Sequence, residues 1–356
     1  GVESSVWLQS VKLRVLPCPL PPAPCPLSPA PCPLFKHSQK MNRNHLKGLL
    51  LGLTATCFWG SFYPVSRYLF GSEAEKFDEL FVSFLRFAFA FLFLLPFLFR
   101  GDGLQKLRRN WRRDWKLFLF LAAVGIVGEG VLVFVATKHT TAARASLMAN
   151  LSPVFTVLLS WLAGKEMLTG RKVTGMLFGL IGIVVVTLSR GADLFTGDAS
   201  TLCGDFLALG SGACWAVYTV FGGKITEEYG GIFCTAVLFG LGTVLMIPVM
   251  LLAGSKISFD FPGTVWLGLL YLGCCTNGLA NGAWYCALKY VTPGELGSLG
   301  YVSAMITVTF SVVFLDEKIT WPFVFAIVMV LSGVGMMLSL KNKRKSCQAS
   351  ADGQTI

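Results

Sequence analysis

The sequence has little of what soluble proteins and most enzymes depend on. Only 14% of its 356 residues are charged and only three are histidines. A water-soluble globule of this composition could not cover its surface with polar side chains. Most of the chain therefore does not form a soluble enzyme. The sequence contains no Walker A loop, no His-Glu-x-x-His and no Gly-x-Ser-x-Gly. It therefore has no motif for transport driven by ATP hydrolysis, and few residues that could carry out hydrolysis or bind a catalytic metal. We expect no enzyme activity, no cofactor and no metal site.

Apolar and aromatic side chains are abundant instead. The hydrophobic fraction is 54%, with 29 Phe and 9 Trp, which excludes a disordered or fibrous protein. The class that remains is an all-α polytopic membrane protein, because runs of this length in lipid must satisfy their own backbone as helices. The length suits about ten spans of about 20 residues. We expect these spans at 47–70, 78–99, 115–137, 141–162, 171–190, 203–225, 231–253, 263–287, 294–315 and 321–340.

The net charge of +11 comes from basic residues that lie mostly between the apolar runs. This placement is typical of residues that fix orientation in a membrane, so the expected partner is the lipid bilayer and not nucleic acid. If the N-terminus is cytoplasmic, more than twice as many Lys and Arg residues fall inside as outside, which predicts that both termini are cytoplasmic. The Arg-rich stretch 100–116 contributes most, and we expect it at the lipid headgroups.

Residues 1–40 differ in composition from the apolar runs that follow. They contain a seven-residue repeat of Pro-Cys-Pro-Leu type, and proline at this density blocks helix and sheet alike. We interpret them as a low-complexity leader, disordered or a start-site artefact, with the functional chain opening at Met41. The alternative is a Pro-rich ligand for a partner protein. Most of the cysteines beyond the leader lie in apolar segments, where they act as small hydrophobes.

The second half of the chain repeats the first at an offset of 151 residues. Ser152, Thr156 and Glu166 correspond to Ser303, Thr307 and Glu317. We predict one repeat at 41–190, a second at 191–345 and a cytoplasmic tail at 346–356. Each repeat holds five expected helices, an odd number, so the second would enter the bilayer from the opposite side. Such inverted repeats provide two nearly equivalent packings, one open to each side, around a site near the midplane.

Several short motifs in both halves point to one family. They are Phe58-Trp59-Gly60 with Tyr63 and Arg67, Arg86-Phe87, Ala145 to Pro153, Gly164-Lys165-Glu166, and Asp316 to Thr320. With them, residues 41–345 resemble the drug/metabolite transporter superfamily and, within it, the EamA-like permeases. The resemblance implies ten helices as two inverted five-helix repeats around a central cavity. It also implies movement of small metabolites, often as export. The second repeat departs from the family pattern at two positions. It has Ala304 where the first repeat has Pro153, and Gly223 where the first repeat has Arg67.

Glu129 lies near the middle of the third expected helix, between Gly128 and Gly130. A charged carboxylate at the bilayer centre costs on the order of 2.5–3.5 kcal/mol, so it should face a cavity or a partner. We predict a proton-coupling carboxylate or a counter-charge for a cationic substrate group; the alternative is a structural carboxylate paired with a cation such as Arg86. Arg86 itself is predicted either as a gate-side ion pair or as a ligand for a substrate anion.

Other polar and aromatic side chains are candidates to line the cavity. Asn277 and Asn281 share a helix face and would bind substrate or hold helices together. Aromatic pairs in the first and sixth expected helices suit a cavity that binds amphipathic molecules. The alternative is that they pack between helices or lie at the membrane–water interface. The predicted substrate-binding set is Trp59, Tyr63, Glu129, Asn150, Trp215, Tyr218, Asn277, Asn281, Trp284 and Tyr301. A small-residue stripe (Gly175, Gly179, Gly182) predicts close helix packing and would allow a homodimer.

Taken together, the residues and the resemblance predict a secondary transporter of a small organic metabolite, such as an amino acid or a drug-like compound. We expect an exporter working by alternating access in a bacterial inner membrane, driven by protons through Glu129, by exchange or by the substrate gradient. One alternative is a membrane scaffold or receptor-like protein without transport. Another is a membrane-embedded lipid-modifying enzyme, which would need His or Asp residues clustered at one interface.

Overall fold

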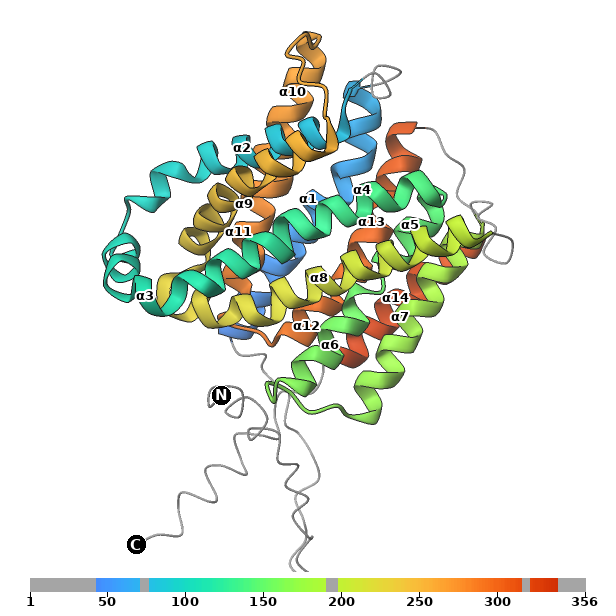
Figure 1. The fold of residues 1–356 in the computed structure, drawn as a ribbon. Helices are drawn as coiled ribbons and strands as arrows, with labels where there is room; N and C mark the ends of the chain where they lie inside the picture. The colour runs from blue at the N-terminus through green and yellow to red at the C-terminus, as the bar shows by residue number, and fades with distance from the viewer. Residues whose placement is uncertain (1–42, 71–76, 190–197, 316–320, 339–356) are drawn as a thin grey trace, which may run out of the picture. The chain divides into compact units, whose positions relative to one another are not determined.

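A computed structural model describes residues 43–70, 77–189, 198–315 and 321–338. The predictions for the leader 1–40 and the tail 346–356 lie outside these residues. Throughout the described ranges the chain forms helices joined by short connections, without a β-strand (Figure 1). The all-helical part of the sequence-based prediction is therefore confirmed.

The helices of the first half are α1 (Arg43–Phe70), α2 (Glu79–Leu98), α3 (Gly103–Leu121), the π-helical segment η2 (Ala122–Gly128), α4 (Glu129–His139), α5 (Ala142–Ala149), α6 (Ser152–Leu162) and α7 (Gly170–Ser189). Those of the second half are α8 (Ala199–Tyr229), α9 (Gly231–Ala253), α10 (Gly263–Tyr271), the π-helical segment η3 (Leu272–Leu279), α11 (Ala280–Ala287), α12 (Pro293–Ser298), α13 (Gly300–Leu315) and α14 (Trp321–Leu338).

Each expected span coincides with one helix or with consecutive helical segments. Among the described residues, eight helical stretches are long and apolar enough to cross a membrane. The stretches 263–287 and 294–315 are helical as well but are not among those eight. The first of them carries Thr276, Asn277 and Asn281, all buried, which lower its hydropathy without facing lipid. Composition thus supports a membrane protein and leaves the count of ten as a prediction.

The largest boundary difference is at the third expected span, which was placed at 115–137. Helix already begins at Gly103 and continues through η2 and α4 to His139. Its first turns are amphipathic and basic, with Leu107 buried and Arg108 exposed, so hydropathy alone does not detect them.

Short polar side chains set where several helices begin. The carboxylate of Asp78 accepts hydrogen bonds from the amides of Leu80 (3.1 Å) and Phe81 (3.0 Å), which satisfies two of the unpaired donors at the start of α2. Asp198 caps α8 in the same way. Gly254, with φ of 65°, ends α9 in the left-handed conformation.

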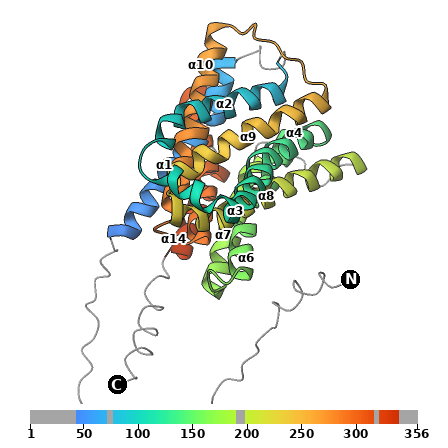
Figure 2. The same ribbon diagram turned by 60° about the vertical axis from the view of Figure 1, so that its left-hand side comes forward.

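The closest helix contact joins the two halves along α7 and α14, which lie side by side in Figures 1 and 2. A Cβ on Gly175 would come within 2.7 Å of the Gly333 carbonyl oxygen, and one on Gly333 within 2.5 Å of the Gly175 carbonyl oxygen. Gly182 faces Ala326 and Val330 of α14. The predicted small-residue stripe is therefore used for packing inside the chain, and it offers no argument for a homodimer.

Candidate functional site

Three tryptophans from both halves meet where α1, α8 and α11 pack together. The ring centroids of Trp59 and Trp215 are 5.0 Å apart, those of Trp59 and Trp284 are 5.0 Å apart, and those of Trp215 and Trp284 are 5.9 Å apart. Trp284 is fully buried, whereas Trp59 and Trp215 are partly exposed. We call these three residues the tryptophan cluster; it presents an aromatic surface from helices of both repeats.

Two tyrosines, one on α8 and one on α11, extend the tryptophan cluster. Tyr218 lies 5.3 Å from Trp215 and 4.6 Å from Tyr285, centroid to centroid. The Tyr285 hydroxyl donates to the Tyr218 carbonyl oxygen at 3.1 Å. Gly125 of η2 allows this arrangement, because a Cβ there would come within 2.4 Å of the Tyr218 side chain. The side chain of Tyr63 lies outside the described part of the structure.

Indole hydrogen bonds fix the orientation of the tryptophan cluster. Trp59 Nε1 donates to the Thr276 carbonyl oxygen at 2.9 Å, which joins α1 to η3. Trp284 Nε1 donates to Thr219 Oγ1 at 3.1 Å, which joins α11 to α8. Rings that are both packed and hydrogen-bonded hold a defined surface instead of an adaptable one.

Glu129 is the first residue of α4 and follows directly on η2. Its side chain is partly exposed although it lies within a membrane-spanning stretch. Across the described residues we find neither a hydrogen-bond donor nor an ion-pair partner for its carboxylate. Arg86, Cys214 and Tyr218 are close enough to interact with it electrostatically. The half-buried Glu129 thus lies at the edge of the aromatic surface.

Arg86 on α2 links this carboxylate to the amides of the second half. Its Nη2 donates to Asn277 Oδ1 at 3.5 Å, and its guanidinium lies 4.5 Å from the centroid of the Phe62 ring. Asn277 is buried, and its Nδ2 has no hydrogen-bond acceptor in the part of the chain that the structure describes. A cation, an anion and an unused amide donor therefore gather beside the tryptophans, which suits a substrate with both polar and apolar parts.

The two π-helical segments occupy equivalent places in the repeats. Shifted by 151 residues, η2 (122–128) falls on 273–279, and η3 spans 272–279. Glu129 then corresponds to Ala280, the first residue of α11. π-Helical turns are rare and often lie at functional sites, since they displace side chains from regular helical positions. Glycine density in both segments was the only sequence signal for them.

Three other predicted residues are placed differently. The Asn150 side chain, at the break between α5 and α6, donates to the Ser146 carbonyl oxygen at 2.8 Å. Asn281 is buried, and its backbone carbonyl oxygen accepts from Thr235 Oγ1 of α9 at 3.4 Å. Its side-chain Oδ1 has no hydrogen-bond donor among the described residues. Tyr301 is fully buried against Gly179 of α7. Asn150 therefore bonds within its own helix end, whereas the buried side chains of Asn281 and Tyr301 lie among packed helices. Substrate binding by these three residues stays a prediction.

The Lys165–Glu166 turn, between α6 and α7, contacts two helices of the second half. Glu166 Oε1 accepts from Ser160 Oγ at 2.7 Å and from the Gly294 amide of α12, and Oε2 pairs with Lys172. Lys165 donates to the Val220 carbonyl oxygen of α8, and burial lowers the pKa of its ammonium group. Sequence reasoning recognised the turn as a motif but not its partners, because Gly294 is 128 residues away.

The starts of α5 and α12 carry two further buried polar clusters. At α5, Arg144 forms an ion pair with Asp205 of α8, whose Oδ1 also accepts from Thr140 Oγ1 at 2.9 Å. At α12, Glu295 Oε2 accepts from the Thr292 amide at 3.1 Å and lies 3.5 Å from His45 Nε2 of α1. Both clusters tie a short helix of one repeat to the first turns of a long helix of the other.

Comparisons with known proteins identify relatives that are named as transporters. The family model described as the EamA-like transporter family matches residues 46–188 and again residues 202–339. The chain is 31% identical over 270 residues to an uncharacterized transporter of Archaeoglobus fulgidus, covering 76% of this chain and 89% of that protein. It is 29% identical over 285 residues to the uncharacterized inner membrane transporter YedA of Escherichia coli, covering 77% and 87%.

A third relative, the uncharacterized inner membrane transporter YicL of Salmonella typhimurium, is 24% identical over 304 residues and covers 84% of this chain and 97% of its own. One crystal structure superposes with a TM-score of 0.69 at 20% identity, covering 87% of this chain and 99% of its own. At that identity the superposition supports the fold alone.

Proposed function

Because the chain belongs to the EamA-like transporter family, we propose that it is a secondary transporter that moves a small organic metabolite by alternating access. The chain is an integral membrane protein whose relatives are named transporters, two of them of inner membranes. The finer proposal is a ten-helix protein of two inverted repeats in a bacterial inner membrane. Both termini would be cytoplasmic, and the expected direction is export.

The buried clusters support two opposed ends. The stretch 142–162 begins beside the Arg144–Asp205 pair and ends at the Lys165–Glu166 turn. At 1.5 Å per residue it is about 30 Å long, which is the thickness of the hydrocarbon core. This length supports a position near one membrane face for the Arg144–Asp205 pair and near the other face for the Lys165–Glu166 turn, and each of them joins the two repeats. Transporters commonly bind cargo near the bilayer midplane at interrupted helices, and the break between α5 and α6 falls near the middle of this stretch.

A single observation carries the proposal: Glu129 is a carboxylate in a spanning stretch that is partly exposed and, within the described chain, unpaired. An intramembrane charge without a partner is expensive, and it is typical of an ion or substrate pathway. The tryptophan cluster offers ring faces that attract cations. We therefore favour a substrate with an amino or other cationic group and an apolar part, with Glu129 either binding that group or carrying a proton in its place.

The experiment has two stages. Thermal-shift screening of the purified protein against a metabolite panel identifies a compound that stabilises it; binding at 100 times Kd is worth about 2.7 kcal/mol. That compound is then used for flux measurements in proteoliposomes with and without a pH gradient. We compare the wild type with Glu129→Gln and with Asp102→Asn, a control that removes an exposed carboxylate in the α2–α3 connection.

We expect gradient-dependent flux in the wild type and in Asp102→Asn, and its loss in Glu129→Gln. Flux that depends on the gradient and survives Glu129→Gln would exclude Glu129 as the proton carrier. Absence of flux for every stabilising compound, with the protein folded, would favour the scaffold alternative.

A further inference from the structure

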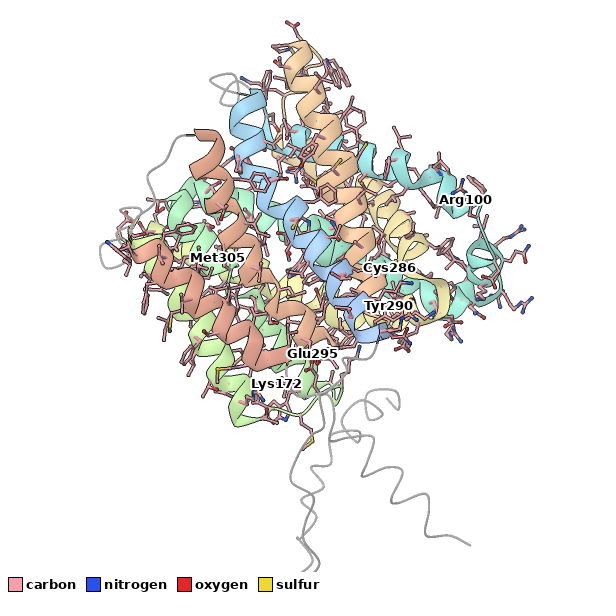
Figure 3. All side chains as sticks on the ribbon, turned by 180° about the vertical axis from the view of Figure 1, so that it is seen from behind. Arg100, Lys172, Cys286, Tyr290, Glu295 and Met305 are labelled. Atoms are coloured by element: carbon pink, nitrogen blue, oxygen red, sulfur yellow. The ribbon has the colours of Figure 1, made fainter. Side chains whose placement is uncertain are left out.

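The first turns of α3 carry basic side chains that the rest of the structure does not neutralise. Arg108, Arg109, Arg112 and Lys116 are all exposed, and we call them the cationic stripe. Three of them follow at intervals of four residues, so they share one face of the helix. The opposite face, which includes Leu107 and Phe118, is buried in the protein. Figure 3 shows nitrogen-tipped side chains projecting outward beside the labelled Arg100.

Neighbouring acids are already engaged by other groups. Asp102 pairs with Lys106 at 2.9 Å. Buried Asp114 pairs with Arg113 at 2.7 Å and accepts from the Tyr229 hydroxyl. Glu228 of α8 accepts from Asn110 at 2.7 Å and from Arg113. For the cationic stripe itself, the described residues provide no carboxylate partner. Like charges one helical turn apart repel each other, and the described part of the chain does not supply their counter-charge.

The position of the stripe identifies that counter-charge. The apolar run begins at Leu117, directly after Lys116. From there the helix rises 1.5 Å per residue, so Arg112 lies about 6 Å from Lys116 along the axis and Arg108 about 12 Å. The headgroup layer on each side of the hydrocarbon is about 5–8 Å deep. Trp111, 47% exposed, belongs to the residue type that settles at this boundary.

We propose that the cationic stripe is a binding site for anionic phospholipid headgroups, which retains such lipids against the protein. Lys116 and Arg112 reach the phosphates directly. Arg108 and Arg109 act from the outer edge of the layer, within the Debye length of about 8 Å at physiological salt. The proposal does not depend on transport.

The test uses the full chain in nanodiscs of equimolar phosphatidylcholine and phosphatidylglycerol, with retained lipid counted by native mass spectrometry. One variant changes all four stripe residues to Gln. The control makes the same change at four exposed basic residues elsewhere, which are Arg43, Arg171, Lys224 and Lys289. Thermal unfolding in pure phosphatidylcholine verifies that both variants fold.

We expect the wild type and the control to retain phosphatidylglycerol preferentially, and the stripe variant to lose this preference. Each cation removed should cost about fivefold in affinity, with Lys116→Gln and Arg112→Gln costing more than Arg108→Gln and Arg109→Gln. The proposal is overturned if the stripe variant keeps its preference, if the control loses as much, or if soluble glycerol phosphate displaces the lipid, which would identify a free-phosphate site.

Discussion

The starts of α5 and α12 occupy equivalent places in the two repeats, 151 residues apart, and they differ in chemistry more than in geometry. Each begins after a threonine, Thr141 or Thr292, whose hydroxyl accepts from the amide three residues later. That third residue is Arg144 in α5 and Glu295 in α12, and each contacts a charged or ionisable side chain near the start of a long helix of the other repeat. Backbone position is repeated, whereas the sign of the charge is reversed.

This difference gives the starts of α5 and α12 different kinds of charged contact. The Arg144–Asp205 pair joins two groups that stay charged near neutral pH. The contact between Glu295 and His45 is ionic only when the imidazole is protonated. At α12 the Glu166 carboxylate adds a hydrogen bond from the Gly294 amide. The corresponding Glu317 turn lies outside the described residues. The α5 end thus includes a buried ion pair between an arginine and an aspartate, whereas at α12 the contact between Glu295 and His45 is ionic only with a protonated imidazole.

The largest effect should come from breaking the Arg144–Asp205 pair. Arg144→Met leaves the Asp205 carboxylate buried without its cation, which we expect to destabilise the protein by about 3–5 kcal/mol. Thermal unfolding in detergent measures the loss. The double variant Arg144→Met, Asp205→Leu should recover most of it, because the penalty comes from the unpaired charge. Equal instability of the single and double variants would contradict this account of the α5 end.

A second test concerns the contact between α7 and α14 on which both ends depend. Gly175→Ala directs a methyl group at the Gly333 carbonyl oxygen, 2.7 Å from the Cβ position, and should cost about 1–3 kcal/mol by overpacking. Gly335→Ala is the control, because its Cβ would meet nothing within 4 Å. Unfolding midpoints of the two variants that shift equally would show that α7 and α14 do not need this close approach.

The comparison of the two ends also shows what the sequence could and could not predict. Apolar runs located the helices, since burial in lipid requires long apolar stretches; α9 spans the predicted 231–253. The internal offset identified Glu166 and Glu317 as equivalents. It could not show that Glu166 accepts from Gly294, because that contact depends on how the two halves pack.

The structure brings some of the predicted site residues together and surrounds others with contacts that a single helix face does not reveal. Trp59 and Trp215 were chosen as repeat equivalents, and the structure places their rings 5.0 Å apart. Tyr301 was chosen by its own helix face, and the structure places it against Gly179 of α7. The π-helical segment before Glu129 has no periodic signal, because it arises from local geometry and glycine.

At the α12 end we expect a smaller effect than at the α5 end. Glu295→Gln keeps an oxygen that can accept from the Thr292 amide but removes the charge facing His45. A loss of about 1–2 kcal/mol is expected, below that of Arg144→Met, because the neutral Gln amide keeps its hydrogen bond and adds no buried charge of its own. Thermal unfolding in detergent measures it. A cost as large as that of Arg144→Met would show that the two ends are held equally strongly.

The smallest expected effect is the difference in stability cost between removing the Thr141 cap and removing the Thr292 cap. Thr141→Ala and Thr292→Ala each remove a hydroxyl that accepts a backbone amide, and such changes cost about 1 kcal/mol. Thr292 also belongs to a capping box, in which Glu295 returns a bond to the Thr292 amide, so that bond survives the substitution. Thr292→Ala should therefore cost somewhat less than Thr141→Ala in thermal unfolding, with Thr→Ser at each position as the control that keeps the hydroxyl. The reverse order would mean that the hydroxyl of Thr292, and not the carboxylate of Glu295, dominates the start of α12.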